Sequence, residues 1–363
     1  MEWLSNGAIT LATATRMGYQ RTPHNERVST DIMSQDQKGQ IGYFSERPGN
    51  EVSGGSVAMN RTSRLFALGT LAISFVYLPG NGWAQSPQRS STIAVGPQYD
   101  STHVYVSPSD VDSFVASFLG TFGGKTSKQL TVTVTPTPSS TTSQILQTPV
   151  GTVSLFGFKT PIPTPFGAER TGYLVTNMDA AIQQAHASGA EVVVTPFPDP
   201  IGVDAILRFP GGMMTQIYWH TTAPSYAPLA SVPENRVYLS QDAADAFLRS
   251  FLTFSGGQVV ADQPTASGDE IGKPGTTFRR IQVTSTFGKL LLFVTDGHLP
   301  YPYGREITGY EVEDLASTLK KATLLGVKVL ISPVAVQGRA SAIVQFPGDY
   351  IAEIHSSVSS TPH

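Results

Sequence analysis

The chain has 363 residues, a formal net charge of −3 and 14% charged residues, against about 25% in an average globular protein. It contains no cysteine, which excludes disulfide frameworks, cysteine-ligated zinc or iron–sulfur centres and a thiol nucleophile. The near-neutral balance, without long Lys/Arg runs, argues against a nucleic-acid-binding protein.

The first 58 residues are polar and rich in Gly, Ser and Asn, and they show no sustained apolar periodicity. Such a segment cannot bury enough apolar surface to fold, so residues 1–58 are predicted to be a disordered extension.

The segment 59–84 has the layout of a secretory signal peptide. Arg61 and Arg64 give it a positive start, and Leu65–Leu78 is an apolar run. Pro and Gly residues follow, and small residues flank a cleavage position after Ala84. The run is shorter than the about 20 residues that span a bilayer, although a buried helix or a short anchor is the alternative. We expect a periplasmic or secreted protein that is free of the membrane after cleavage.

Export signals act at the N-terminus, yet this one begins far from Met1. We therefore hypothesise that translation starts at Met59 and that residues 1–58 reflect a misassigned start codon.

The remainder of the chain is an internal duplication. Val104–Gly124 aligns without gaps on Val237–Gly257, and a second phrase beginning at Pro165 aligns on one beginning at Pro302. This predicts two homologous domains that pack together within one chain. The boundaries follow from the alignment: linker 85–100, domain 101–222, linker 223–235, domain 236–356 and tail 357–363.

Each domain reads as two similar halves of the order β-α-β-β-β. In the first half, apolar residues recur at helical spacing over Asp110–Phe122, and Gly123 follows as a C-terminal cap. In the second half, Asn177 is placed to cap a helix that stops at Gly189. The predicted class is α+β, with curved mixed sheets and helices outside them. Strand-like runs follow the second-half helices: 192–195, 205–209 and 215–219, then 329–332, 341–346 and 351–355.

Four phrases resemble one superfamily. QFPGDYIAEIH at 345–355 resembles the F-x-D-P-x-G-x-x-x-E-L ending of the vicinal oxygen chelate (VOC) superfamily, the glyoxalase/bleomycin-resistance/dioxygenase group. THVYVSPSDVDSFVASFLGTFGG resembles its opening strand, helix and turn, and TGYLVTNMDAAIQQAHASGAEV and TGYEVEDLASTLKKATLLGVKV resemble its second-half opening. The resemblance covers about 240 residues. It implies tandem glyoxalase-like domains, each of two βαβββ modules that form a cupped mixed sheet around a cavity.

The resemblance also implies a place for a divalent metal, held by His, Gln or Glu from the first and last strand of each module. Such an ion needs about three N/O ligands and open positions for substrate. In the first domain these positions fall on His103 and Gln216, with Ser154 and Arg170 at the other two. His103 has a structural, hydrogen-bonded role as its alternative, and Gln216 can simply bond across the first cup.

In the second domain the same positions fall on Arg236 and Glu353, with Ile307 near the third and only apolar residues at the fourth. Neither cup contains three ligands, so we expect no cofactor, although His103, Gln216 and Glu353 are the metal candidates if a divalent ion binds. Arg236 and Glu353 are expected to form an ion pair where the metal would lie. An extradiol dioxygenase, which needs a His-His-Glu set, is rejected.

One loop of the second domain, Asp296–Glu306, combines aromatic and cationic side chains just before a module opening. Such a loop can rim a cavity for an anionic or planar ligand, and a Pro-stiffened linker is the alternative. The candidate residues are His298, Tyr301, Tyr303 and Arg305.

No nucleophile elbow, phosphate loop, His-Glu-x-x-His motif or dinucleotide fingerprint occurs. The expected function is therefore small-molecule binding in a cup by an exported protein with a degenerate metal site. One alternative is a metal-dependent lyase or isomerase of the glyoxalase type that uses His103 and Gln216. The other is a structural or partner-binding protein whose cups are filled by side chains.

The export hypothesis predicts that protein recovered outside the cytoplasm begins at Gln85, which N-terminal sequencing or intact mass will show. An exported form that still carries residues 1–84 would contradict it.

Overall fold

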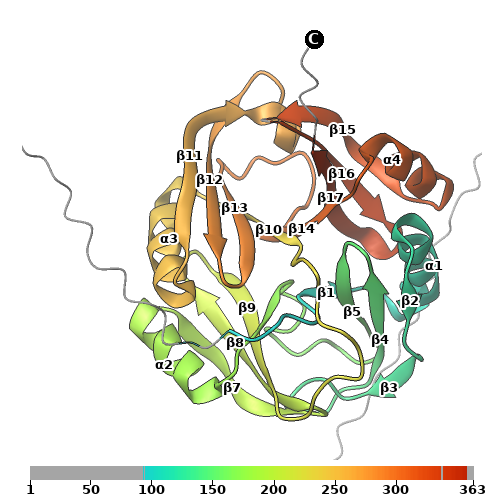
Figure 1. The fold of residues 1–363 in the computed structure, drawn as a ribbon, viewed down its shortest axis with the longest axis vertical. Helices are drawn as coiled ribbons and strands as arrows, with labels where there is room; N and C mark the ends of the chain where they lie inside the picture. Colours follow the sequence, from blue (N-terminus) through green and yellow to red (C-terminus); the bar gives the residue numbers. More distant parts are fainter. Residues whose placement is uncertain (1–92, 94, 337, 358–363) are drawn as a thin grey trace, which may run out of the picture. The chain divides into compact units, whose positions relative to one another are not determined.

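The computed structural model describes residues 93, 95–336 and 338–357. These residues belong to one compact unit, and the predicted extension 1–58 and signal segment 59–84 lie outside them. Four βαβββ modules follow one another, so the predicted α+β class is confirmed (Figure 1). The one local difference is that the second strand of the first module is split into two short strands.

The first domain contains two of the modules. The first consists of β1 (Thr102–Tyr105), a 3₁₀ turn η1 (Pro108–Asp110), α1 (Val111–Phe122), β2 (Lys125–Thr126), β3 (Leu130–Val132), β4 (Thr141–Thr148) and β5 (Gly151–Phe158). The second consists of β6 (Gly172–Leu174), α2 (Met178–Ser188), β7 (Glu191–Asp199), β8 (Gly202–Phe209) and β9 (Met213–His220).

The second domain repeats the arrangement. Its first module consists of β10 (Glu234–Leu239), α3 (Gln241–Ser255), β11 (Gln258–Ser267), η2 (Gly268–Ile271), β12 (Thr277–Ser285) and β13 (Gly288–Val294). Its second consists of β14 (Glu306–Glu311), α4 (Leu315–Leu324), β15 (Lys328–Val336), β16 (Arg339–Phe346), η3 (Pro347–Asp349) and β17 (Tyr350–Ser357).

Local sequence sets the ends of the helices. The Asn177 side chain accepts a hydrogen bond from the Ala180 N–H at 2.9 Å, as predicted, and Gly189 closes α2 with φ of 82°. Asp314 caps α4 in the same way through the Ser317 N–H. Among the described residues, no helix is long and apolar enough to cross a membrane.

Each domain curves its strands into a cup. In every module the first strand pairs in parallel with the last, so that His103 lies opposite Ser154, Gly172 opposite Gln216 and Gly309 opposite Glu353. In the second domain, antiparallel pairing of β10 with β14 joins both modules into one eight-stranded sheet. In the first domain the two module sheets meet only at a bridge between Thr102 and Thr171. We call the concave faces the first cup (residues 101–222) and the second cup (residues 236–356).

The helices of the two domains pack against one another outside the cups. Figure 1 shows α1 beside α4 and α2 beside α3, and the contacts agree. Each of the two large apolar clusters therefore contains residues of both domains. The buried ring of Phe118 on α1, for example, lies 5.5 Å from that of Tyr310 and 5.3 Å from that of Phe346. Since the core lies between the domains, each cup is left facing away from it.

Candidate functional site

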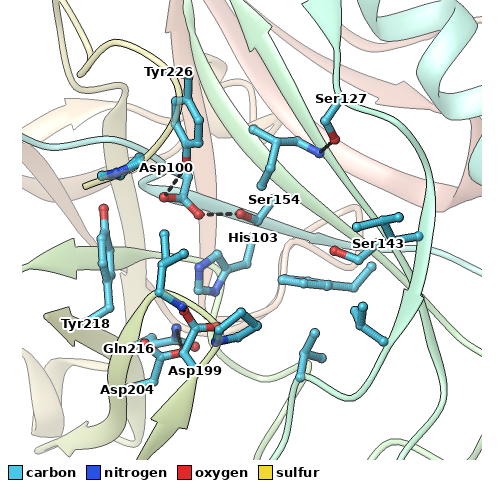
Figure 2. A pocket seen from close by; sticks show the side chains of 18 of the residues that line it. Asp100, His103, Ser127, Ser143, Ser154, Asp199, Asp204, Gln216, Tyr218 and Tyr226 are labelled. Atoms are coloured by element: carbon cyan, nitrogen blue, oxygen red, sulfur yellow. Dashed lines mark hydrogen bonds between the residues drawn. The ribbon is translucent and has the colours of Figure 1, made fainter. Parts of the chain in front are cut away.

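The first cup encloses a cavity of about 640 Å³. His103 and Gln216, predicted to lie in this cup, both line it, and Ser154 lies beside them (Figure 2). His103 comes from β1, Ser154 from β5 and Gln216 from β9. Parallel pairing brings His103 beside Ser154, and the bridge between Thr102 and Thr171 joins their sheet to the one that carries Gln216.

His103 lies deep in this cavity and is 3% exposed, but its Nδ1 has no hydrogen-bond partner in the described structure. The nearest acidic oxygen, Oε1 of Glu169, is 3.9 Å away, and Glu169 instead accepts a hydrogen bond from the Tyr105 hydroxyl. The Phe156 ring meets the imidazole edge-on at 5.8 Å. The Nδ1 of His103 therefore lacks the hydrogen bond that a buried structural histidine usually has.

The Asp100 side chain lines the cavity and lies above His103 in the view of Figure 2. Its carboxylate accepts hydrogen bonds from the Ser154 hydroxyl at 2.5 Å and the Tyr226 hydroxyl at 3.1 Å. Tyr218 also lines the cavity and is 4% exposed, and burial, followed by the charge of Asp100, raises the pKa of its hydroxyl well above the usual value. The wall around Asp100 is thus aromatic and polar at once.

Two further carboxyl groups, Asp199 and Asp204, line the same cavity. Gln216 donates its Nε2 to Asp204 of the neighbouring strand β8 at 3.0 Å, so this hydrogen bond lies within one sheet and does not cross the cup. Burial, followed by the charges of Asp199 and Asp100, raises the pKa of Asp204 well above its usual value, and burial also raises the pKa of Asp199. Burial lowers the pKa of His220 on the same wall, so this imidazole is neutral at pH 7.

The second cup has a different content. Arg236 and Glu353, expected to pair, lie 3.2 Å apart and are both fully buried. Arg236 also contacts Glu270 at 3.3 Å, and its guanidinium carbon stands 4.4 Å from the centre of the Phe293 ring. The predicted ion pair is confirmed, and it belongs to a larger network.

The network continues on both sides. Arg280 contacts Glu270 at 3.5 Å, and Arg339 reaches both Glu234 and Glu353. Burial opposes the charge of Glu353, but Arg236, His355 and Arg339 outweigh burial and hold its pKa at about 2. Around the network an apolar cluster that includes Tyr238, Leu291, Phe293, Ile343 and Ile351 fills the cup.

Neither cup fits a metal centre of the kind that the resemblance implies. Among the described residues, the one group of His, Asp and Glu side chains with atoms within 4.8 Å of one another is Glu234, Glu353 and His355, in the second cup. Their oxygens already face Arg339, Arg236 and the His355 Nδ1, so two guanidinium groups stand where a cation would bind. In the first cup, where His103 and Gln216 are the predicted ligands, no three His, Asp or Glu side chains of the described residues come within that distance of one another. Glu353 lies in the other cup and cannot complete their set.

The candidate loop before β14 does not act as one unit. His298 is 87% exposed at its side chain, and the Tyr301 hydroxyl donates to the Leu330 carbonyl. Tyr303 is buried in the apolar cluster of the second cup. Of the four candidate residues, only Tyr303 and Arg305 line a groove of about 510 Å³ between the domains. Arg170 of the first domain lines the same groove. Arg170 therefore faces this groove and does not line the first-cup cavity.

The groove has a buried carboxyl group at its wall. Glu306 accepts hydrogen bonds from the Arg170 N–H at 2.6 Å and the Thr171 hydroxyl at 2.8 Å, so it ties the second domain to the first. Burial outweighs these donors and raises the pKa of Glu306 to about 7.

The sequence places Glu306 at the end of the candidate loop without giving it a role, and it does not single out the three aspartates of the first cup. A signal for Glu306 is present, because the repeat places Glu169 and Glu306 at equivalent positions, and both prove to be buried. Asp204 interrupts the apolar run of β8, which marks it as a polar group on a half-buried strand. Asp100 falls in the predicted linker 85–100, where no pattern distinguishes it.

Comparison with known proteins supports the fold. No family model matches the sequence, and no curated protein matches it. A mutant of 4-hydroxymandelate synthase from Streptomyces coelicolor is similar in structure, with a TM-score of 0.53 at 12% identity over 72% of this chain and 93% of that chain. Weaker likenesses, each with a TM-score of 0.46 at 12% identity, are to a Mn(II)-bound glyoxalase from Novosphingobium aromaticivorans and to catechol 2,3-dioxygenase, covering 74% of this chain and 84% and 91% of theirs. The chain has the vicinal oxygen chelate fold in tandem.

The second-cup network predicts a large effect of removing its central cation. Arg236→Met leaves Glu353 and Glu270 buried without their shared partner and is expected to cost about 3–5 kcal/mol of unfolding free energy, measured by urea denaturation. Arg279→Met is the matched control on β12, because Arg279 pairs with Asp245 and Asp262 at the surface, and its expected cost is within about 1 kcal/mol. Equal losses in the two variants would contradict the assignment.

Glu306 predicts a pH dependence of stability. Its pKa is higher in the folded protein, about 7, than the 4.5 of a free glutamate, so folding takes up a proton between these values. The stability that the neutral form provides is complete below pH 4.5 and is lost as the pH rises through 7. Relative to Glu306→Gln, the wild type should lose about 3 kcal/mol across this window in denaturation curves. Parallel pH profiles for the two proteins would rule out this role.

Proposed function

We propose that the protein is an exported small-molecule-binding protein and that the first cup is its binding site. The second cup, by contrast, acts as a closed structural element. The observation that carries the proposal is the difference between the cups: the first encloses a cavity of about 640 Å³ lined by polar groups, whereas apolar side chains and a buried ion network fill the second. A cavity of this size suits a small organic ligand.

The polar groups of the first cup support the same conclusion. Asp100, Asp199, Asp204 and Gln216 present carboxyl and amide groups to the cavity. A few polar groups that converge on a pocket fix the orientation of a bound ligand.

The alternative function is a metal-dependent lyase or isomerase of the glyoxalase type. The presence of His103 and Gln216 in one cavity favours it, because each could provide one ligand atom. It is opposed by the lack, among the described residues of this cup, of three His, Asp or Glu side chains close enough to share an ion. Metal analysis separates the two functions: stoichiometric Mn, Fe, Ni or Zn that is lost in His103→Ala would establish the enzyme and overturn the binding proposal.

The binding function is tested by a thermal-shift screen of small acids, amines, alcohols and aromatic compounds against the mature protein. Ligands of the first cup are expected to raise the melting temperature of the wild type but not of Ser143→Trp, because a tryptophan at Ser143 projects from β4 into the cavity. The matched control is Ser317→Trp on the exposed face of α4, which should respond like the wild type. If no compound raises the melting temperature, or if Ser143→Trp responds equally, the first cup is not the binding site.

A further inference from the structure

We infer that the ligand of the first cup is a small organic cation, an amine or quaternary ammonium group on an apolar skeleton. This inference rests on the proposed function, since it names the class of ligand for the same cavity. It follows from the sign of the charge in the cavity, from the absence of internal partners for that charge, and from the aromatic groups around it.

The charged groups that line the cavity are mostly acidic. Asp100, Asp199 and Asp204 all contribute carboxyl groups, and the one Lys or Arg among the lining residues is the exposed Lys125 on β2. None of the three aspartates takes part in an ion pair among the described residues; their hydrogen-bond donors are neutral hydroxyl, amide and backbone groups. The cavity therefore holds three carboxyl groups for which the described part of the protein supplies no counter-charge.

The three carboxyl groups also act on one another. The charges of Asp199 and Asp100 disfavour ionisation of Asp204, and that of Asp100 disfavours ionisation of Asp199. Like charges held together in a half-buried cavity destabilise the empty state, and a bound cation removes both the repulsion and part of the desolvation cost.

The second cup shows how the same fold neutralises its acids. The repeat sets His103 opposite Arg236 and Gly202 opposite Arg339, so two of the three arginines of the second-cup network are replaced by uncharged or weakly basic residues in the first cup. The repeat also sets Gln216 opposite Glu353 and Ser101 opposite Glu234, so the first cup loses acids of the network together with the arginines, and its own acids Asp199 and Asp204 stand opposite the neutral Val336 and Ser341.

Aromatic rings surround the acidic groups. Tyr226 lies above Asp100 and Tyr218 beside it (Figure 2), and the ring of Tyr218 is 5.1 Å from that of His220. Phe156 and Phe166 line the cavity further in. Carboxylates beside aromatic faces suit an ammonium group, because both attract a positive charge, whereas an anion would meet repulsion from either.

The test compares ligands that share a skeleton and differ in charge. The probes are phenethylamine, phenethyl alcohol and phenylacetate, and in parallel tryptamine, tryptophol and indole acetate. Their dissociation constants are measured by NMR titration at pH 8 with the mature wild-type protein. Each amine is expected to bind at least about tenfold more tightly than the alcohol and the acid of its own series.

Two variants locate the effect. Asp204→Asn keeps the shape and the acceptor for Gln216 but removes one charge, and it should weaken amine binding by about tenfold while leaving alcohol binding unchanged. Asp179→Asn removes the same charge from the exposed start of α2, outside the cavity, and should bind like the wild type. Asp199→Asn provides a second removal if Asp204→Asn does not fold.

The outcomes separate the ligand class from the function. Alcohols or acids that bind as tightly as the amines, or amine binding that Asp204→Asn and Asp199→Asn leave intact, would overturn the cation assignment. If the amines fail at millimolar concentration while another compound binds and Ser143→Trp blocks it, the cation assignment is wrong and the binding function stands. If no compound of any class binds, both are wrong.

Discussion

The contact between Arg236 and its two glutamates determines what the second cup can be. Arg236, Glu353 and Glu270 are all buried, and each ion would be costly in the interior without the others. Arg339 and Arg280 extend the pairing, so the acids of this cup face guanidinium groups. A divalent cation would add charge to groups that are already neutralised. The network therefore explains at once why this cup is closed and why it does not fit a metal.

The first cup follows the opposite rule on the same backbone. His103 replaces the central arginine, and the acids Asp100, Asp199 and Asp204 have only neutral hydrogen-bond donors. A cup that is filled by side chains must pair each buried ion with an opposite charge of the protein. A site that binds a charged ligand must instead keep some ions without a protein partner. Such a site reduces the stability of the empty protein in exchange for binding, as functional sites commonly do. Duplication permits this division, because the second domain packs against the helices of the first and supports it.

The sequence was sufficient for the fold, and the reason is repetition. Each of the four βαβββ modules has a helix with one apolar face and a glycine just after its end. A wrong prediction for one module is therefore corrected by comparison with the other three. Pairing of the first and last strands within each module, and of the two modules with each other, then places His103 and Gln216 in one cavity and Arg236 beside Glu353. These contacts could be predicted because they depend on alternation along strands whose ends were recognisable.

The site residues that the sequence did not predict depend on the positions of loops and on how far side chains extend from them. Asp100 precedes β1 and Asp199 ends β7, and nothing in their spacing shows that they share a cavity. The sequence predicts Arg170 in the first cup, but its side chain lines the groove between the domains. The repeat alone does not determine how the two domains are oriented, so it does not predict this groove. Tyr303 was expected at a rim and is packed in a core, because a hydroxyl that donates to the Ile271 carbonyl allows a tyrosine to be buried.

The most direct test of this account measures the unfolding free energy after neutralising one acid in each cup, at pH 8. Glu270→Gln removes the partner of Arg236 and Arg280 and is predicted to cost about 3–5 kcal/mol. Asp204→Asn removes a desolvated carboxylate that lacks a counter-charge, and is predicted to leave the protein as stable as the wild type or more stable. Comparable losses in both variants would show that the two cups balance their charges alike, and would contradict the account.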